Sequence, residues 1–263
     1  MVFLFVGLLF KLSAFPFHVW TPDVYEGAPT FVTAFFALVP KIGVLALLFK
    51  LLSTSFYSSI EQWQPLLVTA AVGSMLIGAL GALGQQRLKR LFAYSTIAHV
   101  GFILLGLATC TWDVSFFYLT LYFVMTIATF SFLLSFGYRN VNELAGIGRS
   151  NPVLGISFAL LLFSMAGVPP LAGFFGKYVV FQSAVASQMY SVALVAVVTS
   201  VMGGVYYLRI IKTMFFAKTD EIVMPVTISP IATYLFAASL GFLVFFWLYP
   251  TPVYVFAETL VHV

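Results

Sequence analysis

The sequence predicts an all-α membrane protein that crosses the bilayer about eight times, with two of the crossing helices discontinuous. Of its 263 residues, 62% are apolar and only 8% are Asp, Glu, Lys or Arg, whereas about a quarter of the residues in a soluble domain are charged. The apolar residues form long unbroken runs instead of the alternation typical of membrane β-barrels. These observations exclude a water-facing globular fold.

Eight apolar stretches have the length of a membrane-spanning helix, about 20 residues. They cover residues 1–19, 30–53, 65–84, 91–110, 114–136, 152–186, 189–211 and 228–250. The sixth is too long for one straight crossing, and Gly167, Pro169 and Pro170 interrupt it. Proline removes a backbone donor and glycine loosens a helix, so we predict two half-helices with a break between them. The first stretch is similarly disturbed from Ser13 to Pro16.

The loops between these stretches predict how the chain is oriented in the membrane. Side A is defined as the end that holds the loop 20–29, and side B as the other end. Side B has one basic residue, Lys50. Side A has the following basic residues: Arg87, Lys89, Arg90, Arg139, Arg149, Arg209, Lys212 and Lys218. By the positive-inside rule, side A is the cytoplasmic or matrix face, and both chain ends lie on side B.

Three lysines remain inside the predicted spans: Lys11, Lys41 and Lys177. A lysine charge at the bilayer centre costs about 2.5–3.5 kcal/mol on insertion scales, so these residues need protein or water around them. Snorkelling to the interface is the alternative, and it suits Lys50, near a span end, better than Lys41. Lysine also suits proton transfer, because desolvation brings its pKa towards neutrality.

The fourth span adds a polar face formed by Tyr94, Ser95, Thr96 and His99. Ser95 and His99 are one helical turn apart. A neutral histidine in such a stripe can relay protons near physiological pH. The alternative is a core histidine whose nitrogens are satisfied by a backbone carbonyl.

Few other residues suggest chemistry. Asp23 and Glu26 in the side A loop are expected to be solvated or paired, and no carboxylate lies inside a span beside the three lysines. The sequence lacks a P-loop, a nicotinamide-binding glycine motif, a histidine pair for haem and an HExxH motif, and Cys110 is the single cysteine. We therefore expect no catalytic, metal-binding or cofactor-binding residue in this chain, and no nucleic-acid partner.

The two interrupted spans indicate an inverted repeat. They run in opposite directions, each carries a lysine, and they are five spans apart, as in transporters built from five-helix repeats. We predict that residues 1–63 are the last two helices of an incomplete first repeat. Residues 64–211 then form the second repeat, and residues 212–263 a C-terminal loop and a final helix.

Several motifs resemble one family. FKLSAFPFHVWTPDVYEGAPT, from Phe10, is similar to the central signature of subunit 2 of respiratory complex I (NADH:ubiquinone oxidoreductase). RLKRLFAYSTIAHVGFILLG from Arg87, ELAGIGRSNP from Glu143 and FSMAGVPPLAGFFGKYVVF from Phe163 agree with it. The resemblance implies an antiporter-like membrane-arm subunit that translocates protons, driven by quinone reduction elsewhere in the complex.

The resemblance also implies functional residues and partners. Lys11, Lys41 and Lys177 match the central-axis lysines of the family, and His99 falls in a motif of the same axis. Phe31 stands where the family commonly has proline. The family also begins several helices earlier, with a glutamate that pairs with the lysine matching Lys11. We expect a second polypeptide to supply that front half, together with other membrane-arm and accessory subunits and membrane lipids.

Ubiquinone, FMN, iron–sulfur clusters and NADH are implied for the complex and not for this chain. The phenylalanine-rich composition and the expected split gene favour the mitochondrial inner membrane, with a bacterial plasma membrane or a thylakoid as alternatives. Two other functions stay open: a subunit of a cation/proton antiporter without redox coupling, and a structural membrane subunit that transports nothing.

Overall fold

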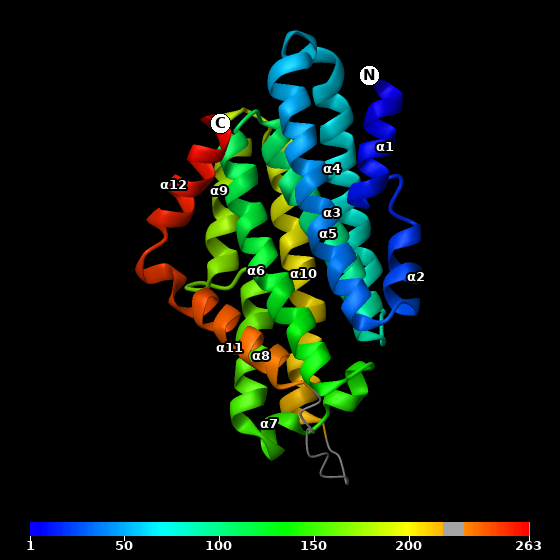
Figure 1. Ribbon diagram of the computed structural model, residues 1–263, viewed down its shortest axis with the longest axis vertical. Coiled ribbons are helices and arrows are strands. Elements are labelled where there is room, and N and C mark those ends of the chain that lie inside the picture. The colour runs from blue at the N-terminus through cyan, green and yellow to red at the C-terminus, as the bar shows by residue number, and fades with distance from the viewer. Residues whose placement is uncertain (218–228, 263) are drawn as a thin grey trace.

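The computed structural model describes residues 1–217 and 229–262, and in these residues the chain is a bundle of helices (Figure 1). Within this part of the chain there is no β-sheet, and a single β-bridge joins Arg87 to Asn140. Most helices run along the long axis of the molecule. The predicted all-α fold is therefore confirmed.

Six helices are long and apolar enough to cross a membrane. They are α3 (Thr30–Lys50), α4 (Ile60–Leu83), α5 (Leu88–Ala108), α6 (Trp112–Phe136), α10 (Tyr190–Phe216) and α11 (Pro230–Phe245). A π-helical turn at 51–55 extends α3, and a 3₁₀ turn at 246–248 extends α11. The total of eight crossings stays a prediction, because the remaining apolar helices are shorter.

Each interrupted span contains a break between two short helices, but the second half-helix of the first pair lies beyond residue 19, where that span was predicted to end. The first pair is α1 (Val2–Leu12) and α2 (Trp20–Gly27), and the second is α8 (Pro152–Ala166) and α9 (Ala172–Ala186). The half-helix before each break ends at a left-handed residue, Ser13 with φ 66° and Gly167 with φ 89°. The pairs run in opposite directions along the long axis (Figure 1).

One predicted boundary was wrong. Residues 20–29 were expected to be a loop, but most of them form α2. Pro22 is compatible with this helix because it lies in the first turn, where its missing N–H would have no partner in any case. The division into two repeats stays a prediction; its limits at residues 64 and 211 lie within α4 and α10.

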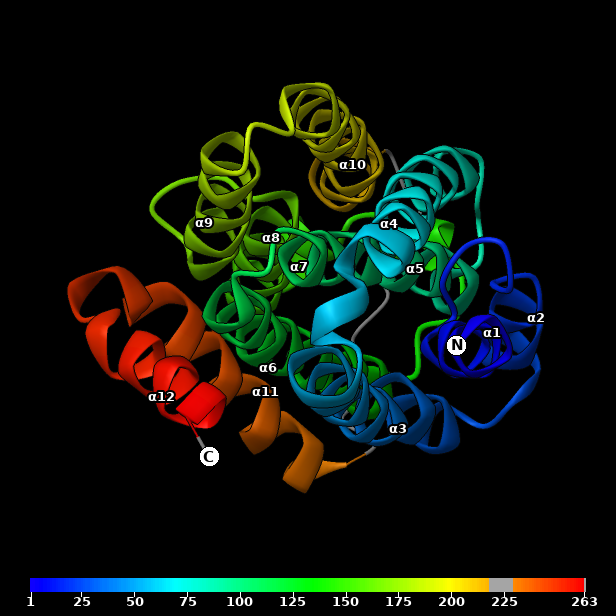
Figure 2. The same cartoon turned by 90° about the horizontal axis from the view of Figure 1, so that it is seen from above.

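A helix that was not predicted, α12 (Thr251–His262), follows α11 and packs against α6. The Tyr254 hydroxyl donates to Asp113 Oδ2 over 3.0 Å, and its ring packs edge-on against Phe117. The short helix α7 (Ile147–Ser150) precedes α8. Seen from above, α11 and α12 flank the bundle on one side and α1 to α3 on another (Figure 2).

Helix α5 lies at the centre and contacts α2, α4, α6 and α9. Nearly all of its residues are buried, as expected of a helix that other helices enclose on every side. The backbones of α4 and α5 approach closely, because a Cβ atom on Gly78 would lie 2.5 Å from the backbone nitrogen of Ala98. Small residues permit such packing between membrane helices.

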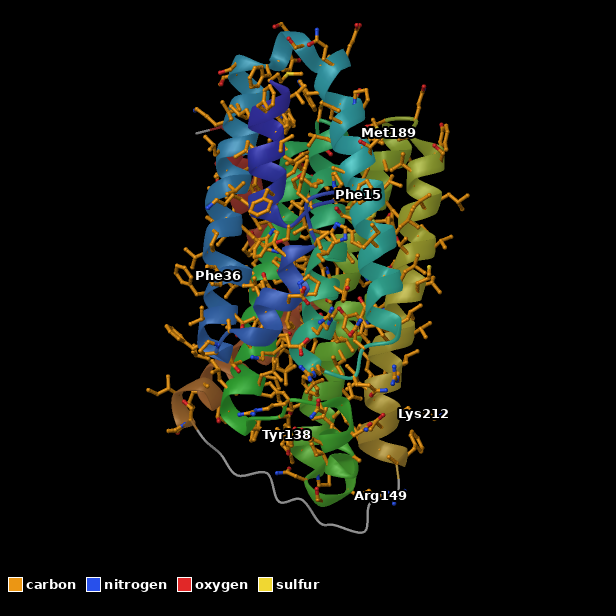
Figure 3. The ribbon with its side chains drawn as sticks, turned by 90° about the vertical axis from the view of Figure 1, so that its right-hand side faces the viewer. Phe15, Phe36, Tyr138, Arg149, Met189 and Lys212 are labelled. Carbon is orange, nitrogen blue, oxygen red and sulfur yellow. The ribbon has the colours of Figure 1, made fainter. Side chains whose placement is uncertain are left out.

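The predicted orientation agrees with the arrangement of the helix ends. Both termini lie at one end of the bundle in Figure 1. Arg149 and Lys212 lie at one end in Figure 3, and Met189 lies at the other. One of the predicted side A residues, Lys218, lies outside the described residues.

Candidate functional site

Three of the four residues singled out from the sequence lie in the interior of the bundle. Lys41 on α3, His99 on α5 and Lys177 on α9 are 1%, 3% and 5% exposed, respectively. The structure therefore excludes snorkelling for both lysines, whose side chains point into protein. Polar side chains from α5, α6 and α10 lie around them, and several contact His99 or one another. We refer to the following residues as the interior axis: Lys41, Ser95, Thr96, His99, Tyr118, Tyr122, Lys177 and Tyr207.

Lys177 is held at the break between α8 and α9. Its Nζ donates to the carbonyl oxygen of Ala166, the last residue of α8, over 2.8 Å. The same nitrogen lies 5.5 Å from the centroid of the Phe102 ring on α5, within the range of a cation–π contact. The aliphatic part of the side chain packs on Gly167, where an added Cβ would lie 2.9 Å from Cδ. The break thus creates the position that the lysine occupies.

His99 has a hydroxyl partner near each ring nitrogen. Nδ1 lies 2.8 Å from the hydroxyl of Tyr118 on α6, and Nε2 lies 3.5 Å from that of Tyr207 on α10. The Tyr207 hydroxyl is in turn 2.5 Å from Ser95 Oγ. Tyr118 also packs on Gly176, next to Lys177. Because hydroxyl groups both donate and accept, these contacts link the imidazole to neighbours on both sides.

Lys41 differs from Lys177 because its Nζ is buried without a hydrogen-bond partner among the described residues. The hydroxyl of Tyr122 on α6 donates to the carbonyl oxygen of Ala37, one turn before Lys41, over 3.4 Å. It also lies 3.3 Å from Thr96 Oγ1, and its ring centroid is 5.6 Å from that of His99. Tyr122 therefore bridges the helix that carries Lys41 and the helix that carries His99.

Lys11 is the exception. It lies in the last turn of α1, before the break, and its side chain is exposed on the surface of the chain. The expectation that protein encloses all three lysines is thus met for two of them within this chain. Nothing in the structure brings Lys11 to the interior axis, so its role stays a prediction.

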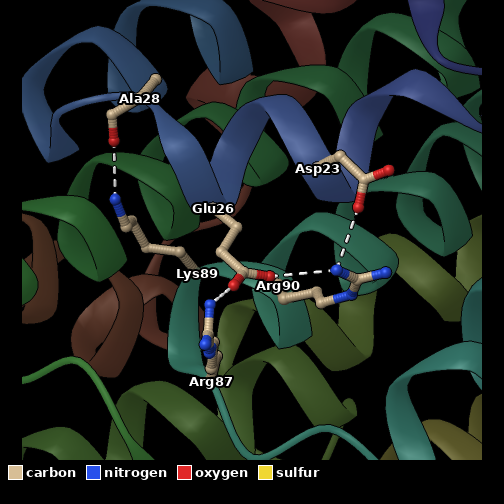
Figure 4. A network of polar contacts seen from close by, with 6 residues as sticks. All are labelled: Asp23, Glu26, Ala28, Arg87, Lys89 and Arg90. Atoms are coloured by element: carbon tan, nitrogen blue, oxygen red, sulfur yellow. Dashed lines mark hydrogen bonds and ion pairs between the residues drawn. The ribbon is translucent and has the colours of Figure 1, made fainter.

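Asp23 and Glu26 on α2 are ion-paired, which confirms one of the two expectations for them (Figure 4). Arg90 Nη1 lies 2.9 Å from Asp23 Oδ1 and 3.1 Å from Glu26 Oε2, and Arg87 also pairs with Glu26. Lys89 Nζ donates to the carbonyl oxygen of Ala28 over 2.6 Å. These contacts attach the second half-helix to the start of α5.

Sequence reasoning missed the tyrosines of the interior axis. Tyr118 and Tyr122 lie in an apolar run that is rich in phenylalanine, and Tyr207 follows Tyr206 in a run of small and aliphatic residues, so none of the three differs clearly from an ordinary packing residue. The polar residues that they contact lie on other helices, and the sequence does not show which helices meet. Among the described residues, no group of three His, Cys, Asp or Glu side chains is placed to hold a metal ion.

Comparisons with known proteins agree on the family. The family model described as NADH:quinone oxidoreductase/Mrp antiporter, transmembrane, matches residues 1–203. NADH-quinone oxidoreductase subunit N of Parvibaculum lavamentivorans is 47% identical over 95% of this chain and 53% of its own length. The protein of the same name from Pelagibacter ubique is 45% identical over 84% of this chain and 48% of its own. The chain thus spans about half the length of the curated relatives it matches.

Solved structures agree with this fold. A chain of respiratory complex I from Thermus thermophilus, solved with bound aureothin, has a TM-score of 0.82 and 34% identity and covers 95% of this chain and 56% of its own. A chain of the Mrp complex from Dietzia has a TM-score of 0.86 at 20% identity, over 98% and 57% of the two chains, which shows the fold alone.

Two expectations need correction. The relatives are named subunit N, and not subunit 2 as the motifs led us to expect. Nothing among them supports a second polypeptide that supplies the front half.

Proposed function

Because the chain belongs to the NADH:quinone oxidoreductase/Mrp antiporter family of transmembrane proteins, we propose that it is a proton-translocating membrane-arm subunit of an NADH–quinone oxidoreductase. The relatives are subunits of that enzyme. Quinone reduction, NADH oxidation, FMN and iron–sulfur clusters belong in this proposal to other subunits. This chain contributes the proton path.

The interior axis is the observation that carries the proposal. Two lysines and a histidine are buried in an apolar bundle. Ionisable residues in such a place are costly, and those that occur usually serve a function. The Lys41 amine has no partner among the described residues. A buried polar group of this kind is usually satisfied by water, so the space around Lys41 is expected to be hydrated.

Protons pass in this proposal between Lys41 and Lys177. His99 accepts a proton at one ring nitrogen and releases one from the other. Tyr118 lies between the imidazole and the neighbourhood of Lys177, and Tyr122 lies between the imidazole and the helix of Lys41. Lys11 exchanges protons with Lys41 in this proposal, although its side chain lies on the surface and outside the interior axis. A change in what pairs with Lys11 then shifts the proton affinities along the axis.

The proposed partners are other membrane-arm subunits and accessory subunits of the same complex, together with membrane lipids. The bacterial relatives favour the bacterial plasma membrane, which was the alternative to the mitochondrial inner membrane.

An antiporter subunit without redox coupling is the second candidate, and the likeness to a chain of the Mrp complex favours it. Co-purification separates the two, because only the oxidoreductase subunit would bring flavin and iron–sulfur proteins with it. A purely structural role is disfavoured by the cost of burying two lysines.

Lys41→Met tests the proposed function, with Lys50→Met as the matched control. Both lysines belong to α3, but Lys41 is buried whereas Lys50 is exposed at the helix end. Methionine fills a similar volume without a titratable group. In vesicles that contain the assembled complex, Lys41→Met should reduce proton translocation several-fold, and Lys50→Met should not.

Assembly is checked for both variants by the amount of complex on a native gel. Unchanged proton translocation in an assembled Lys41→Met complex would refute the axis.

A further inference from the structure

A cleft of about 760 Å³ lies on side A, outside the interior axis. The end of α2, the start of α3, the α4–α5 loop and the end of α6 form its walls. It is lined by the following residues: Glu26, Gly27, Ala28, Pro29, Thr30, Arg87, Lys89, Leu133, Leu134, Gly137, Tyr138, Arg139 and Asn140. None of the steps proposed for proton transfer uses this cleft.

The rim of the cleft is fixed by backbone hydrogen bonds between two loops. The Leu88 N–H donates to the Arg139 carbonyl over 2.8 Å, and the Val141 N–H donates to the Gln86 carbonyl over 2.9 Å. The Glu143 carboxylate accepts from the backbone N–H of Arg139 over 2.7 Å. These bonds hold the α4–α5 loop beside the α6–α7 loop. The backbone positions from which the basic side chains of the two loops extend are therefore fixed relative to one another.

The lining carries an excess of positive charge. It contains Arg87, Lys89 and Arg139, whereas its one carboxylate, Glu26, is already shared between Arg87 and Arg90 (Figure 4). The lining also contains a neutral polar group. Tyr138 is 8% exposed, and its hydroxyl oxygen has no partner among the described residues. Buried polar atoms normally have a partner, so such a group indicates a missing one.

We propose that this cleft binds an anion that carries a phosphate group. Arg139 and Lys89 supply charged donors, and the Tyr138 hydroxyl supplies a neutral one. Charge-assisted hydrogen bonds from such groups are the strong contacts by which proteins hold phosphates. Leu133, Leu134 and Pro29 form an apolar wall beside these donors. The phosphodiester of a membrane lipid and free phosphate share the required chemistry.

The position of the cleft suits a lipid headgroup. Side A is the basic end of the bundle, which faces the leaflet whose anionic lipids attract juxtamembrane basic residues. An acyl chain attached to the phosphate would have the apolar wall to lie against. The site does not depend on proton translocation.

Native mass spectrometry of the full chain in detergent tests this proposal, with phosphatidylglycerol and inorganic phosphate as separate probes. Arg139→Gln should weaken binding about five-fold, as expected for the loss of one basic group near a membrane surface. Tyr138→Phe should also weaken binding, although it changes no charge. Arg149→Gln is the matched control, because Arg149 lies at the same end of the bundle but does not line the cleft.

The two probes distinguish the sources. Binding of phosphatidylglycerol that depends on Arg139 identifies a lipid headgroup, and binding of inorganic phosphate alone with the same dependence identifies free phosphate. Equal losses for Arg139→Gln and Arg149→Gln would overturn the proposal, as would binding of neither probe.

Discussion

The buried ionisable residues of the interior axis differ in their hydrogen-bond partners. Lys177 donates to a backbone carbonyl, and His99 has hydroxyl groups near both ring nitrogens. Lys41 has no partner among the described residues. A buried group without a partner costs about 1–3 kcal/mol or more, so Lys41 is where water is most needed.

Tyr118→Phe tests the hydroxyl contacts of His99. The variant keeps the ring that packs on Gly176 but removes the hydroxyl beside Nδ1. Proton translocation should fall several-fold, while the free energy of unfolding should fall by only about 0.5–1.5 kcal/mol, the net worth of one hydrogen bond. Vesicle proton uptake and thermal unfolding measure the two effects.

Tyr254→Phe is the matched control for that experiment. It also loses one hydrogen bond, to Asp113, but lies away from the interior axis. Equal falls in proton uptake for the two variants would show that Tyr118 acts through stability alone.

At this scale the sequence predicted the charged residues and missed their neutral partners. Lys41 and Lys177 could be found because a charge in an apolar run is costly wherever the chain folds. Tyr118 and Tyr122 could not, because their role depends on which helices meet. The exposure of Lys11 could not be predicted for the same reason.

The two discontinuous helices are the elements that shape the site. The break between α8 and α9 depends on close backbone approach, since a Cβ on Gly173 would lie 1.8 Å from the Ser164 carbonyl oxygen. The Gly173 N–H also donates to Ser164 Oγ over 3.2 Å. The end of one half-helix therefore packs directly on the start of the other.

Gly173→Ala should separate the two half-helices and destabilise the protein by about 1–3 kcal/mol, the usual cost of overpacking. Gly43→Ala on α3 is the control, because a Cβ there meets nothing within 4 Å. That variant should be neutral or slightly stabilising, since alanine favours a helix more than glycine does. Thermal unfolding in detergent compares them, and a Gly173→Ala variant as stable as Gly43→Ala would contradict the tight packing.

The breaks themselves could be predicted, because proline and glycine act locally. Helix α2 was missed because a segment with proline, aspartate and glutamate between apolar runs has the composition of a loop. Its helical form is supported by ion pairs from Glu26 to Arg87 and Arg90, residues far along the chain. Helix α12 was missed because it follows a complete span and is fixed by packing on α6.

The orientation of the whole molecule follows from its asymmetric charge. The described basic loop residues gather at one end of the bundle, and the positive-inside rule predicts that this end is the cytoplasmic or matrix face. This part of the arrangement could be predicted from sequence, because the rule depends only on where spans begin and end. An error of a few residues at a boundary does not change which side a loop occupies.

Cysteine labelling checks this orientation. In a Cys110→Ser background, Arg149→Cys should react with a membrane-impermeant maleimide only from the cytoplasmic side. Met189→Cys, at the opposite end of the bundle (Figure 3), should react only from the outside. Both positions labelling from one side would show that the predicted topology is wrong.

The bond from Lys177 to the end of α8 has a mechanical consequence. One amine both closes the open end of a half-helix and serves as a candidate proton carrier. If the amine moves away, the carbonyl oxygen of Ala166 loses its donor, so the hydrogen bond opposes the movement. A displacement of α8 relative to α9 would therefore also change the proton affinity of Lys177, because this hydrogen bond would be lost.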